Sequence, residues 1–390
     1  MKRLRELIKK FCPEGVPYIP IAELGTLTRG KRFVHADAVE DGIPCIHYGE
    51  LYTYYGLWTE KTKSFVRKEL SDQLRYAQKN DVIIVGAGEN DTDIGIAVAY
   101  LGDKNVAVHD ACYILRQNND PRYISYCLRT SDYHNQIKKY VSTGKICAIS
   151  AEGIGKARIP IPPLEVQREI VQLLDNFTDV IEELTVELTA ELTARKKQYE
   201  FYRQKIITFD ETMPVIPIRE VAKVTIGEFV HKNKQNSNAP FPVFNGGITN
   251  TGYYDDFNRE ANKIIISARG ANAGYVNRVF TRYWSGNSCY TVDVKNPLLN
   301  WNYVYFWLKT NEGKLIGKQQ KGGIPAVSKK QVEDFLICVP NIEEQERIVS
   351  ILEKFEKLCD DICECISAEI EARRKQYEYY RDKLLTFKEA

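Results

Sequence analysis

The 390-residue chain lacks the features that mark metalloproteins, disulfide-stabilised proteins and membrane proteins. Its ten cysteines include no CxxC pair and its five histidines show no HxxxH spacing, so we expect no metal site. Free thiols indicate a reducing compartment. No apolar run approaches about 18 residues, and the charged start is too short for a signal peptide. These absences predict a cytoplasmic protein without a membrane span.

The usual nucleotide and cofactor motifs are also missing. The segment that starts at Gly86 is not GxGxxG, because Asp91 stands at the last glycine, and no GxxxxGK[ST] loop is present. The sequence also lacks an [ND]PP[YFW] tetrapeptide, which an adenine methyltransferase of the usual type uses for its flipped base. We therefore expect a non-catalytic chain that binds no cofactor itself. An enzyme acting alone is the alternative that these absences disfavour.

What the sequence does contain is an internal repeat. IPIPPLEVQREIVQLLDNF (159–177) resembles ICVPNIEEQERIVSILEKF (337–355), and ARKKQYEFYRQKIITF (194–209) resembles ARRKQYEYYRDKLLTF (372–387), at a constant offset of 178 positions. The segments before them correspond weakly, as IPIAEL does to IPIREV and VIIVGAG to KIIISARG. We predict five parts, which are a short N-terminal helix and lead-in (1–18), a globular domain (19–158), a long helix (159–210), a second globular domain (211–336) and a second long helix (337–390).

Both long helices carry apolar residues at alternating steps of four and three, which predicts a coiled-coil seam. The predicted seam residues are Ile170, Leu174, Phe177, Ile181, Leu184, Leu188, Tyr199, Tyr202 and Ile206, with Ile348, Leu352, Phe355, Cys359, Ile362, Ile366, Tyr377, Tyr380 and Leu384 in the second copy. The linker after the first helix is too short to run back along it, so the pair is predicted to be antiparallel, with one globular domain at each end. Residues 2–11 echo the end of the first helix and are predicted to lie beside the end of the second.

Charge is distributed unevenly along the chain. Residues 216–336 contain 16 basic and 9 acidic residues, residues 19–158 are nearly neutral, and both helical segments are acidic. Only the second globular segment is basic enough to indicate a polyanionic partner by itself. Two related domains held apart by a rigid pair of helices can each enter a groove of duplex DNA at a fixed separation. This arrangement predicts a DNA site in two unlike halves.

The repeated segments resemble the conserved regions of specificity subunits of type I restriction-modification systems. The resemblance rests on IxAISxxxIxxxxIPIPPLEVQxxIVxxLD (146–175), on ARKKQYEFYR (194–203), on their second copies and on SARGANAGYV (267–276), whose counterpart near residues 86–96 has diverged. It implies two α/β (α+β) target recognition domains separated by two conserved helices in an antiparallel coiled coil. It also implies double-stranded DNA, two modification (methyltransferase) subunits and restriction subunits as partners. S-adenosylmethionine and ATP with magnesium would be bound by those partners, which methylate adenine N6 and cleave DNA.

Loops that read bases and phosphates need basic and amide side chains. The predicted DNA-binding residues are Arg29, Lys31, Arg32, Lys61, Lys63 and Lys145 in the first domain, and Lys232, Lys234, Asn245, Asn250, Arg269, Asn272, Lys318 and Lys321 in the second. TRGKR (28–32) and STGKI (142–146) are predicted to be the counterparts of HKNKQNSN (231–238) and GKQQKGG (317–323). The alternative is that these residues are solvated surface charges. The aromatic segment YTYYGLW (52–58) is predicted to belong to the core, the alternative being that it packs a loop near the DNA groove.

A second predicted surface lies on the helices, where partner subunits would dock. Its residues are Arg195, Lys196, Phe201 and Arg203, with Arg373, Arg374, Tyr379 and Arg381 in the second copy. Phe201 and Tyr379 lie off the predicted seam. The alternative to docking is a solvated basic face. The alternative to DNA recognition as a whole is a non-catalytic coiled-coil adaptor with two protein-binding heads.

Overall fold

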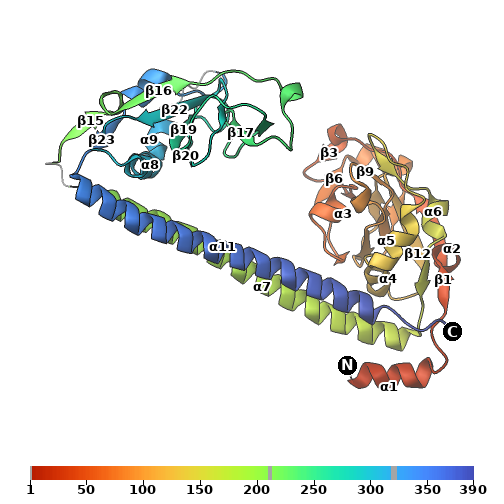
Figure 1. Cartoon of the computed structure of the whole chain (residues 1–390). Helices are drawn as coiled ribbons and strands as arrows, with labels where there is room; N and C mark the ends of the chain where they lie inside the picture. The colour runs from red at the N-terminus through yellow and green to blue at the C-terminus, as the bar shows by residue number, and fades with distance from the viewer. Residues whose placement is uncertain (1, 210–212, 318–322) are drawn as a thin grey trace. The chain divides into compact units, whose positions relative to one another are not determined.

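The computed structural model describes residues 2–209, 213–317 and 323–390 (Figure 1). The chain divides into two compact units, one formed by residues 1–187 and 369–390 and the other by residues 188–368. Each unit contains one globular domain and a stretch of both long helices. Among the described residues, no helix combines the length and the apolar character needed to cross a membrane.

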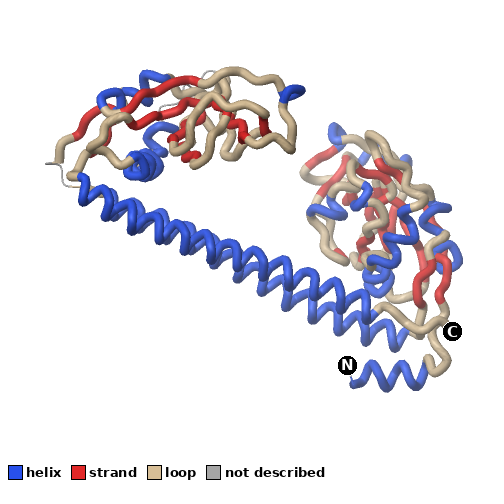
Figure 2. The backbone as a smooth tube through the Cα atoms, in the orientation of Figure 1, coloured by secondary structure: helices blue, strands red, loops and turns tan. Residues whose placement is uncertain are grey.

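The first domain is built on two five-stranded sheets (Figure 2). One has the order β2 (Gly25–Arg29), β12 (Cys112–Gln117), β8 (Val82–Val85), β10 (Ala97–Tyr100) and β5 (Trp58–Thr59). The other has the order β3 (Ala38–Val39), β6 (Ser64–Val66), β4 (Ile43–Ile46), β11 (Val106–Val108) and β7 (Tyr76–Ala77). Two smaller sheets pair β1 (Tyr18–Pro20) with β14 (Arg158–Pro160) and β9 (Ala87–Gly88) with β13 (Cys147–Ala148). Strand β8 reads VIIV and is buried on both faces, as expected for a central strand.

Short helices cover these sheets, and their starts follow ordinary capping rules. They are α2 (Ile21–Leu24), α3 (Glu50–Thr53), α4 (Pro121–Cys127), α5 (Ser131–Lys138) and α6 (Ala151–Gly155), with 3-10 turns η1 (His35–Asp37), η2 (Lys68–Gln73) and η3 (Asp91–Asp93). The Asp120 carboxylate accepts hydrogen bonds from the first amides of α4, which begins with a proline, and Thr130 caps α5 in the same way. The segment 52–58 is divided, because Tyr55 is buried whereas Tyr54 and Trp58 are exposed.

The second domain keeps the central part of this plan with fewer strands. Its main sheet has the order β16 (Ala222–Ile226), β22 (Cys289–Val294), β19 (Lys263–Ser267) and β20 (Val276–Val279). Its smaller sheets are β18 (Gly252–Tyr254), β17 (Phe241–Phe244) and β21 (Trp284–Ser285), and β15 (Val215–Pro217) with β23 (Leu336–Cys338). Its helices are α8 (Trp301–Thr310), α9 (Glu312–Ile316) and α10 (Lys329–Glu333), with turns η4 (Ile218–Glu220) and η5 (Lys232–Lys234). The predicted α/β fold class is therefore confirmed for both domains.

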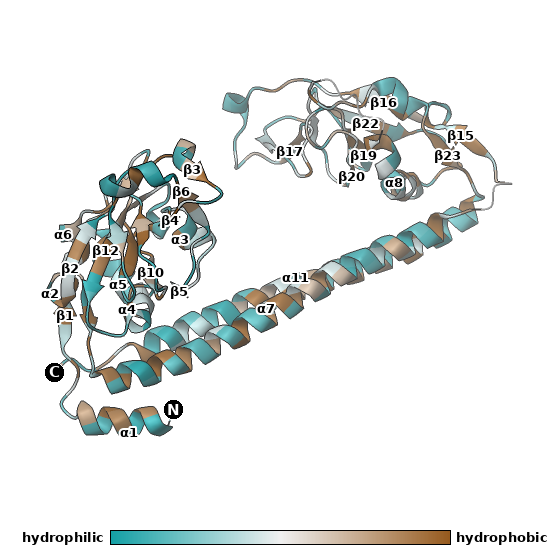
Figure 3. Ribbon diagram, turned by 180° about the vertical axis from the view of Figure 1, so that it is seen from behind, coloured by the Kyte–Doolittle hydropathy of each residue, from teal (hydrophilic) through white to brown (hydrophobic). Residues whose placement is uncertain are grey.

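The long helices α7 (Leu164–Ile207) and α11 (Ile342–Leu384) pair in an antiparallel direction, as predicted. In the first unit, the Thr178 hydroxyl near the start of α7 lies 3.0 Å from the Tyr377 hydroxyl near the end of α11. In the second unit, the Tyr202 ring near the end of α7 lies 5.8 Å from the Phe355 ring near the start of α11. Neither helix contains glycine or proline. Hydrophobic and hydrophilic residues are interspersed along the whole length of both helices (Figure 3).

Part of the predicted seam is wrong by one residue. Phe177 and Tyr202 are exposed, whereas their neighbours Thr178 and Arg203 are half-buried, and the second copy shows the same shift at residues 355–356 and 380–381. Thr178 can occupy the interior because its hydroxyl is bonded to Tyr377, and Arg203 because its guanidinium lies over the Tyr199 ring at 5.4 Å.

The N-terminal helix α1 (Lys2–Phe11) packs within the first unit. Leu4 is buried in the same hydrophobic cluster as Leu385, which follows α11, and Arg3 forms an ion pair of 3.1 Å with Glu169 on α7. The Val16 amide donates to the Lys388 carbonyl at 2.9 Å, so the two ends of the described chain are hydrogen-bonded to each other. This confirms the prediction that residues 2–11 lie beside the end of the second long helix.

Each domain is fixed to a helix start by one buried glutamine. The Gln167 amide donates to the Pro162 carbonyl at 2.8 Å and accepts from the Asp120 amide at 3.0 Å. At the repeat-equivalent position, Gln345 bonds to the Pro340 carbonyl at 2.8 Å and the Asn300 amide at 2.9 Å. Because the two sites share one geometry, the glutamine of the repeated EVQ and EEQ motifs has a structural role.

Candidate nucleic-acid interface

Three loops meet at one edge of the first domain. We name them the β2 loop (28–32), the β8 loop (86–95) and the β12 loop (109–111), after the strand that each follows or precedes. The Gly30 amide donates to the Cys112 carbonyl at 2.9 Å, and the Gly86 amide to the Ala111 carbonyl at 2.7 Å. A Cβ atom at Gly30 would lie 2.2 Å from a carbonyl of the β12 loop, so only glycine fits this close approach.

The second domain has the same three loops with the same hydrogen bonds. They are the β16 loop (225–229), the β19 loop (268–274) and the β22 loop (286–288). The Gly227 amide donates to the Cys289 carbonyl at 3.1 Å, and the Ala268 amide to the Ser288 carbonyl at 2.8 Å. The strand registers agree, because Arg29 pairs with Tyr113 as Ile226 pairs with Tyr290. We call this shared arrangement the loop frame.

The β8 and β19 loops also begin and end alike. Gly95 and Gly274 both have a positive φ, and their amides donate to the Val85 and Ser267 carbonyls at 2.8 and 2.7 Å. The β8 loop is three residues longer than the β19 loop. Both loops nevertheless pair with the same segment of the repeat, because Ala87 pairs with Ala148 and Arg269 with Ala326. The diverged segment near residues 86–96 is therefore the structural counterpart of SARGANAGYV.

One predicted correspondence is wrong. The hydrogen bonds match TRGKR (28–32) with TIGEF (225–229), and not with HKNKQNSN (231–238). The latter segment contains η5 and borders β18 instead, where the Asn236 amide donates to the Tyr253 carbonyl at 3.0 Å. Sequence similarity could not reveal this match, because only the glycine and one threonine are common to the two loops.

In the first domain the loop frame brings several predicted residues together. Arg29, Lys31 and Arg32 are exposed on the β2 loop, and the Arg29 side chain donates to the Asp110 carbonyl at 2.6 Å. Lys145 is exposed on the segment before β13, which pairs with the β8 loop. Lys61 and Lys63 are exposed on the connection from β5 to β6, outside the frame.

In the second domain Arg269 is exposed on the β19 loop, and Asn272 is half-buried on the same loop. Asn245 has an internal role, because its side-chain oxygen accepts from the Ser288 amide at 3.0 Å, and the Asn250 side chain donates to the Gly252 carbonyl at 3.3 Å. Lys232 and Lys234 are exposed on η5, which follows the β16 loop and lies outside the frame. Lys318 and Lys321 lie outside the described residues.

Two histidines in ring contact support the frame of the first domain. The His47 and His109 ring centroids lie 4.3 Å apart, and His109 Nδ1 accepts from the Ala111 amide at 3.1 Å. Burial lowers the pKa of both imidazoles, and for His109 the neighbouring His47 lowers it further. The frame therefore holds both rings in their neutral form at pH 7.

This pair predicts acid sensitivity of the first domain. Since the folded pKa lies below the ordinary value near 6.5, the unfolded chain binds more protons between the two values, and stability falls as the pH decreases through that window. Asn245 is the counterpart of His47, because Ile46 pairs with Val108 as Phe244 pairs with Ser285. The His47→Asn variant, which copies the second domain, is expected to show a smaller loss. Thermal unfolding midpoints at about pH 7.5 and about pH 5.5 measure the difference. An equal loss in the variant would contradict the assignment.

The helix pair exposes aromatic and apolar side chains in two repeat-equivalent patches. The first patch consists of Phe177, Val180, Tyr379 and Tyr380, and the second of Phe355, Leu358, Phe201 and Tyr202. Each of these residues is between 39% and 60% exposed. In the second patch the Phe201, Tyr202 and Phe355 rings follow one another with centroid distances of 5.5 and 5.8 Å. Sequence reasoning found only Phe201 and Tyr379, because it placed the other four aromatic residues in the seam and assigned no role to Val180 and Leu358.

The predicted basic docking residues divide into two kinds. Arg195 and Arg373 each form a 2.8 Å ion pair with the glutamate four residues before, and Arg374 lies 3.5 Å from Glu378. Lys196 is exposed. Arg203 and Arg381 are half-buried, and Arg381 is paired with Asp382 at 2.7 Å. These last two contribute to the packing between the helices, and their docking role stays a prediction.

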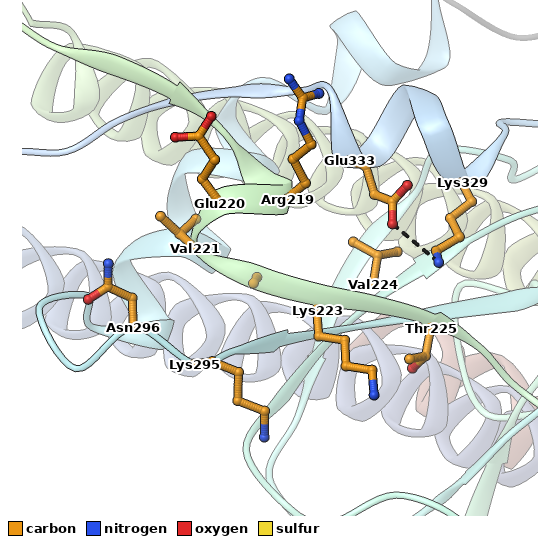
Figure 4. Close-up of a pocket in the computed structure, with 11 residues that line it drawn as sticks. Arg219, Glu220, Val221, Lys223, Val224, Thr225, Lys295, Asn296, Lys329 and Glu333 are labelled. Atoms are coloured by element: carbon orange, nitrogen blue, oxygen red, sulfur yellow. Dashed lines mark ion pairs between the residues drawn. The ribbon is translucent and has the colours of Figure 1, made fainter.

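A shallow pocket of about 630 Å³ lies beside η4 and β16 in the second domain (Figure 4). Its cations are largely neutralised, since Lys329 lies 3.2 Å from Glu333 and Lys295 lies 2.5 Å from Asp293. It extends from η4 along β16 to Thr225, where the β16 loop begins. The described part of the chain holds no cluster of three or more His, Cys, Asp or Glu residues that could bind a metal ion.

A family model for the type I restriction modification DNA specificity domain matches residues 13–194 and 210–372. A putative type I restriction enzyme specificity subunit of Haemophilus influenzae is 35% identical over 250 residues, which cover 59% of this chain and 63% of that protein. The EcoR124I/EcoR124II specificity subunit of Escherichia coli is 34% identical over 261 residues, with the same two shares. The match thus spans less than two thirds of either relative. A chain from a solved structure concerning complex assembly of the type I R-M system has the same fold, with a TM-score of 0.72 at 16% identity over 96% of this chain and 98% of that one.

Proposed function

Because the chain belongs to the type I restriction modification DNA specificity domain family, we propose that it recognises a DNA site made of two unlike halves, one read by each domain. The observation that carries this proposal is the loop frame. The same hydrogen bonds hold three loops in both domains, yet the exposed side chains on those loops differ. A constant frame with different side chains is what two readers of different sequences require.

We propose further that this chain is non-catalytic and acts by placing partner subunits on DNA. The two repeat-equivalent patches on the helix pair fit two copies of one partner, a modification subunit that carries S-adenosylmethionine and methylates adenine N6. Restriction subunits with ATP and magnesium would complete the assembly. A cytoplasmic location follows from this role.

The test of this function is a comparison of DNA affinities. The full chain with its modification subunit is mixed with a duplex that contains the site found by methylation mapping, or with a random duplex of equal length. Specific affinity is expected to exceed non-specific affinity by at least about a thousandfold. Equal affinities would support an adaptor with protein-binding heads instead.

A second measurement tests the β2 loop. Replacing Lys31 and Arg32 by alanine is expected to weaken binding to all sequences, and to reduce the salt dependence of log K by about 0.9 for each phosphate that the protein no longer neutralises. Arg282→Ala serves as the control, because this arginine is exposed and pairs with Glu260 at 2.9 Å. Arg282 follows β20, and the last residue of β20, Val279, pairs with Lys263 at the start of β19. The β19 loop of the frame follows the opposite end of β19. An unchanged slope in the double variant would remove the β2 loop from the interface.

A further inference from the structure

Equivalent loops of the two domains carry opposite charges. The β2 loop has Arg29, Lys31 and Arg32, whereas the β16 loop has an isoleucine, Glu228 and a phenylalanine at these positions. The charges are reversed in the next pair of loops. The β8 loop has three acidic residues and no basic one, whereas the only charged residue of the β19 loop is Arg269. The basic loop of the first domain is therefore the β2 loop, and that of the second domain is the β19 loop. Their counterparts, the β16 and β8 loops, are acidic.

The backbone hydrogen bonds of the loop frame show that Lys31 and Glu228 occupy equivalent positions. The Lys31 amide donates to the Val108 carbonyl at 2.9 Å, and the Glu228 amide donates to the Ser285 carbonyl at 2.8 Å. The indole of Trp284 also donates to the Glu228 carbonyl, at 2.8 Å. Lys31 and Glu228 thus start from the same place in the frame and differ only in the side chain.

Glu89 lies in the β8 loop, close to the position that matches Arg269 of the β19 loop. It follows Ala87 by two residues, and Ala87 is the counterpart of Arg269 through the matching bridges to Ala148 and Ala326. Of the other two acidic residues on this loop, Asp93 accepts from the Asn90 side chain at 3.1 Å. Glu89 is exposed, and within the described ranges no cation lies within ion-pair distance of Glu89 or Glu228.

An unpaired carboxylate beside the proposed DNA surface has a cost, because it repels phosphate. A residue selected only for affinity would not be acidic there. A carboxylate is, however, purely an acceptor of hydrogen bonds, and the cytosine N4 amino group is the base donor that Glu and Asp accept from in the major groove. Repulsion from the backbone and attraction to one base together increase the difference between right and wrong sequences.

We propose, as a deepening of the proposed function, that Glu89 and Glu228 are specificity-determining residues, one in each domain, that accept a hydrogen bond from a base amino group, with cytosine as the preferred base. The basic loop of the same frame, Lys31 with Arg32 in the first domain and Arg269 in the second, then supplies the attraction to DNA. This arrangement also explains why the first domain is almost neutral although it binds a polyanion.

The test uses single variants in the complex of the full chain with its modification subunit. Glu89→Ala is expected to bind a random duplex more tightly and its own site less tightly, so that the ratio of the two affinities falls by about tenfold. Methylation sequencing should show a relaxed base at one position of one half-site. Glu228→Ala should relax one position of the other half-site. Glu89→Gln should shift the preference from cytosine toward adenine, which a glutamine amide binds in bidentate fashion.

The chain provides matched controls at Glu23 and Glu220. Both are exposed acidic residues. Glu23 precedes β2 and Glu220 precedes β16, so each lies at the end of its strand that is opposite to the frame loop. Their alanine variants should leave both the affinity ratio and the methylated sequence unchanged. If the wild-type complex prefers its site and the Glu89 and Glu228 variants keep the same sequence preference, this inference is overturned while the proposed function stands. If the wild-type complex shows no preference, both fail.

Discussion

The Phe201→Glu variant is expected to lose one of two bound modification subunits, and the Phe201→Glu, Tyr379→Glu double variant to lose both. Each aromatic ring lies in one exposed patch of the helix pair, at repeat-equivalent positions. An aromatic anchor at an interface contributes more than its share of the binding energy, so a buried glutamate in its place should weaken docking on the order of a hundredfold. Native mass spectrometry at micromolar concentration should show stoichiometries of two, one and none.

Val186→Glu is the control for this experiment. Val186 is 69% exposed on α7 outside both patches, and its repeat-equivalent on α11 is already a glutamate, Glu364. This variant should bind two partners, and the urea midpoints of all variants should agree because exposed positions contribute little to stability. Two bound partners in the double variant would mean that the patches are not the docking surfaces.

The long helices show what an amino-acid sequence can and cannot predict. Their length, pairing and direction followed from the repeat and the short linker. The seam was misplaced at Phe177 and Tyr202, because the heptad rule assigns the most apolar residue of each turn to the interior. The structure places Thr178 there, where its hydroxyl has a partner, and leaves the rings exposed. Exposed aromatics on a helix that already has a partner helix are better explained by a further partner.

The proposed DNA surface was predictable only in part. Choosing basic residues in glycine-containing loops selected Arg29, Lys31 and Arg269, which the loop frame holds at equivalent edges of the two domains. The same criterion could not select Glu89 or Glu228, since it looked for attraction to phosphate alone. Their place became visible through backbone hydrogen bonds that no sequence pattern records. The individual contacts of all these residues with DNA stay predictions.

The buried glutamines give the largest expected effect on stability. Gln345→Leu fills the same space, but it leaves the Asn300 amide and the Leu298 and Pro340 carbonyls without their partners at 2.9, 3.1 and 2.8 Å. An unsatisfied buried group costs about 1 to 3 kcal/mol, so the loss should reach about 3 kcal/mol or more. Gln198→Leu, an exposed position on α7, should cost less than about 0.5 kcal/mol.

Hydrogen exchange followed by mass spectrometry, peptide by peptide, measures this loss where it arises. In Gln345→Leu, faster exchange is expected at the start of α11 and at the start of α8, because Gln345 bonds to the segments before both helices. In Gln167→Leu the same change is expected at the starts of α7 and α4. Since a domain that is loosened from its helix no longer holds its loop frame at a fixed place on the DNA, each variant should also lower the affinity for the specific site more than that for random duplex. Unchanged exchange at these helix starts would show that the glutamines do not fix the domains to the helices, whatever their effect on DNA binding.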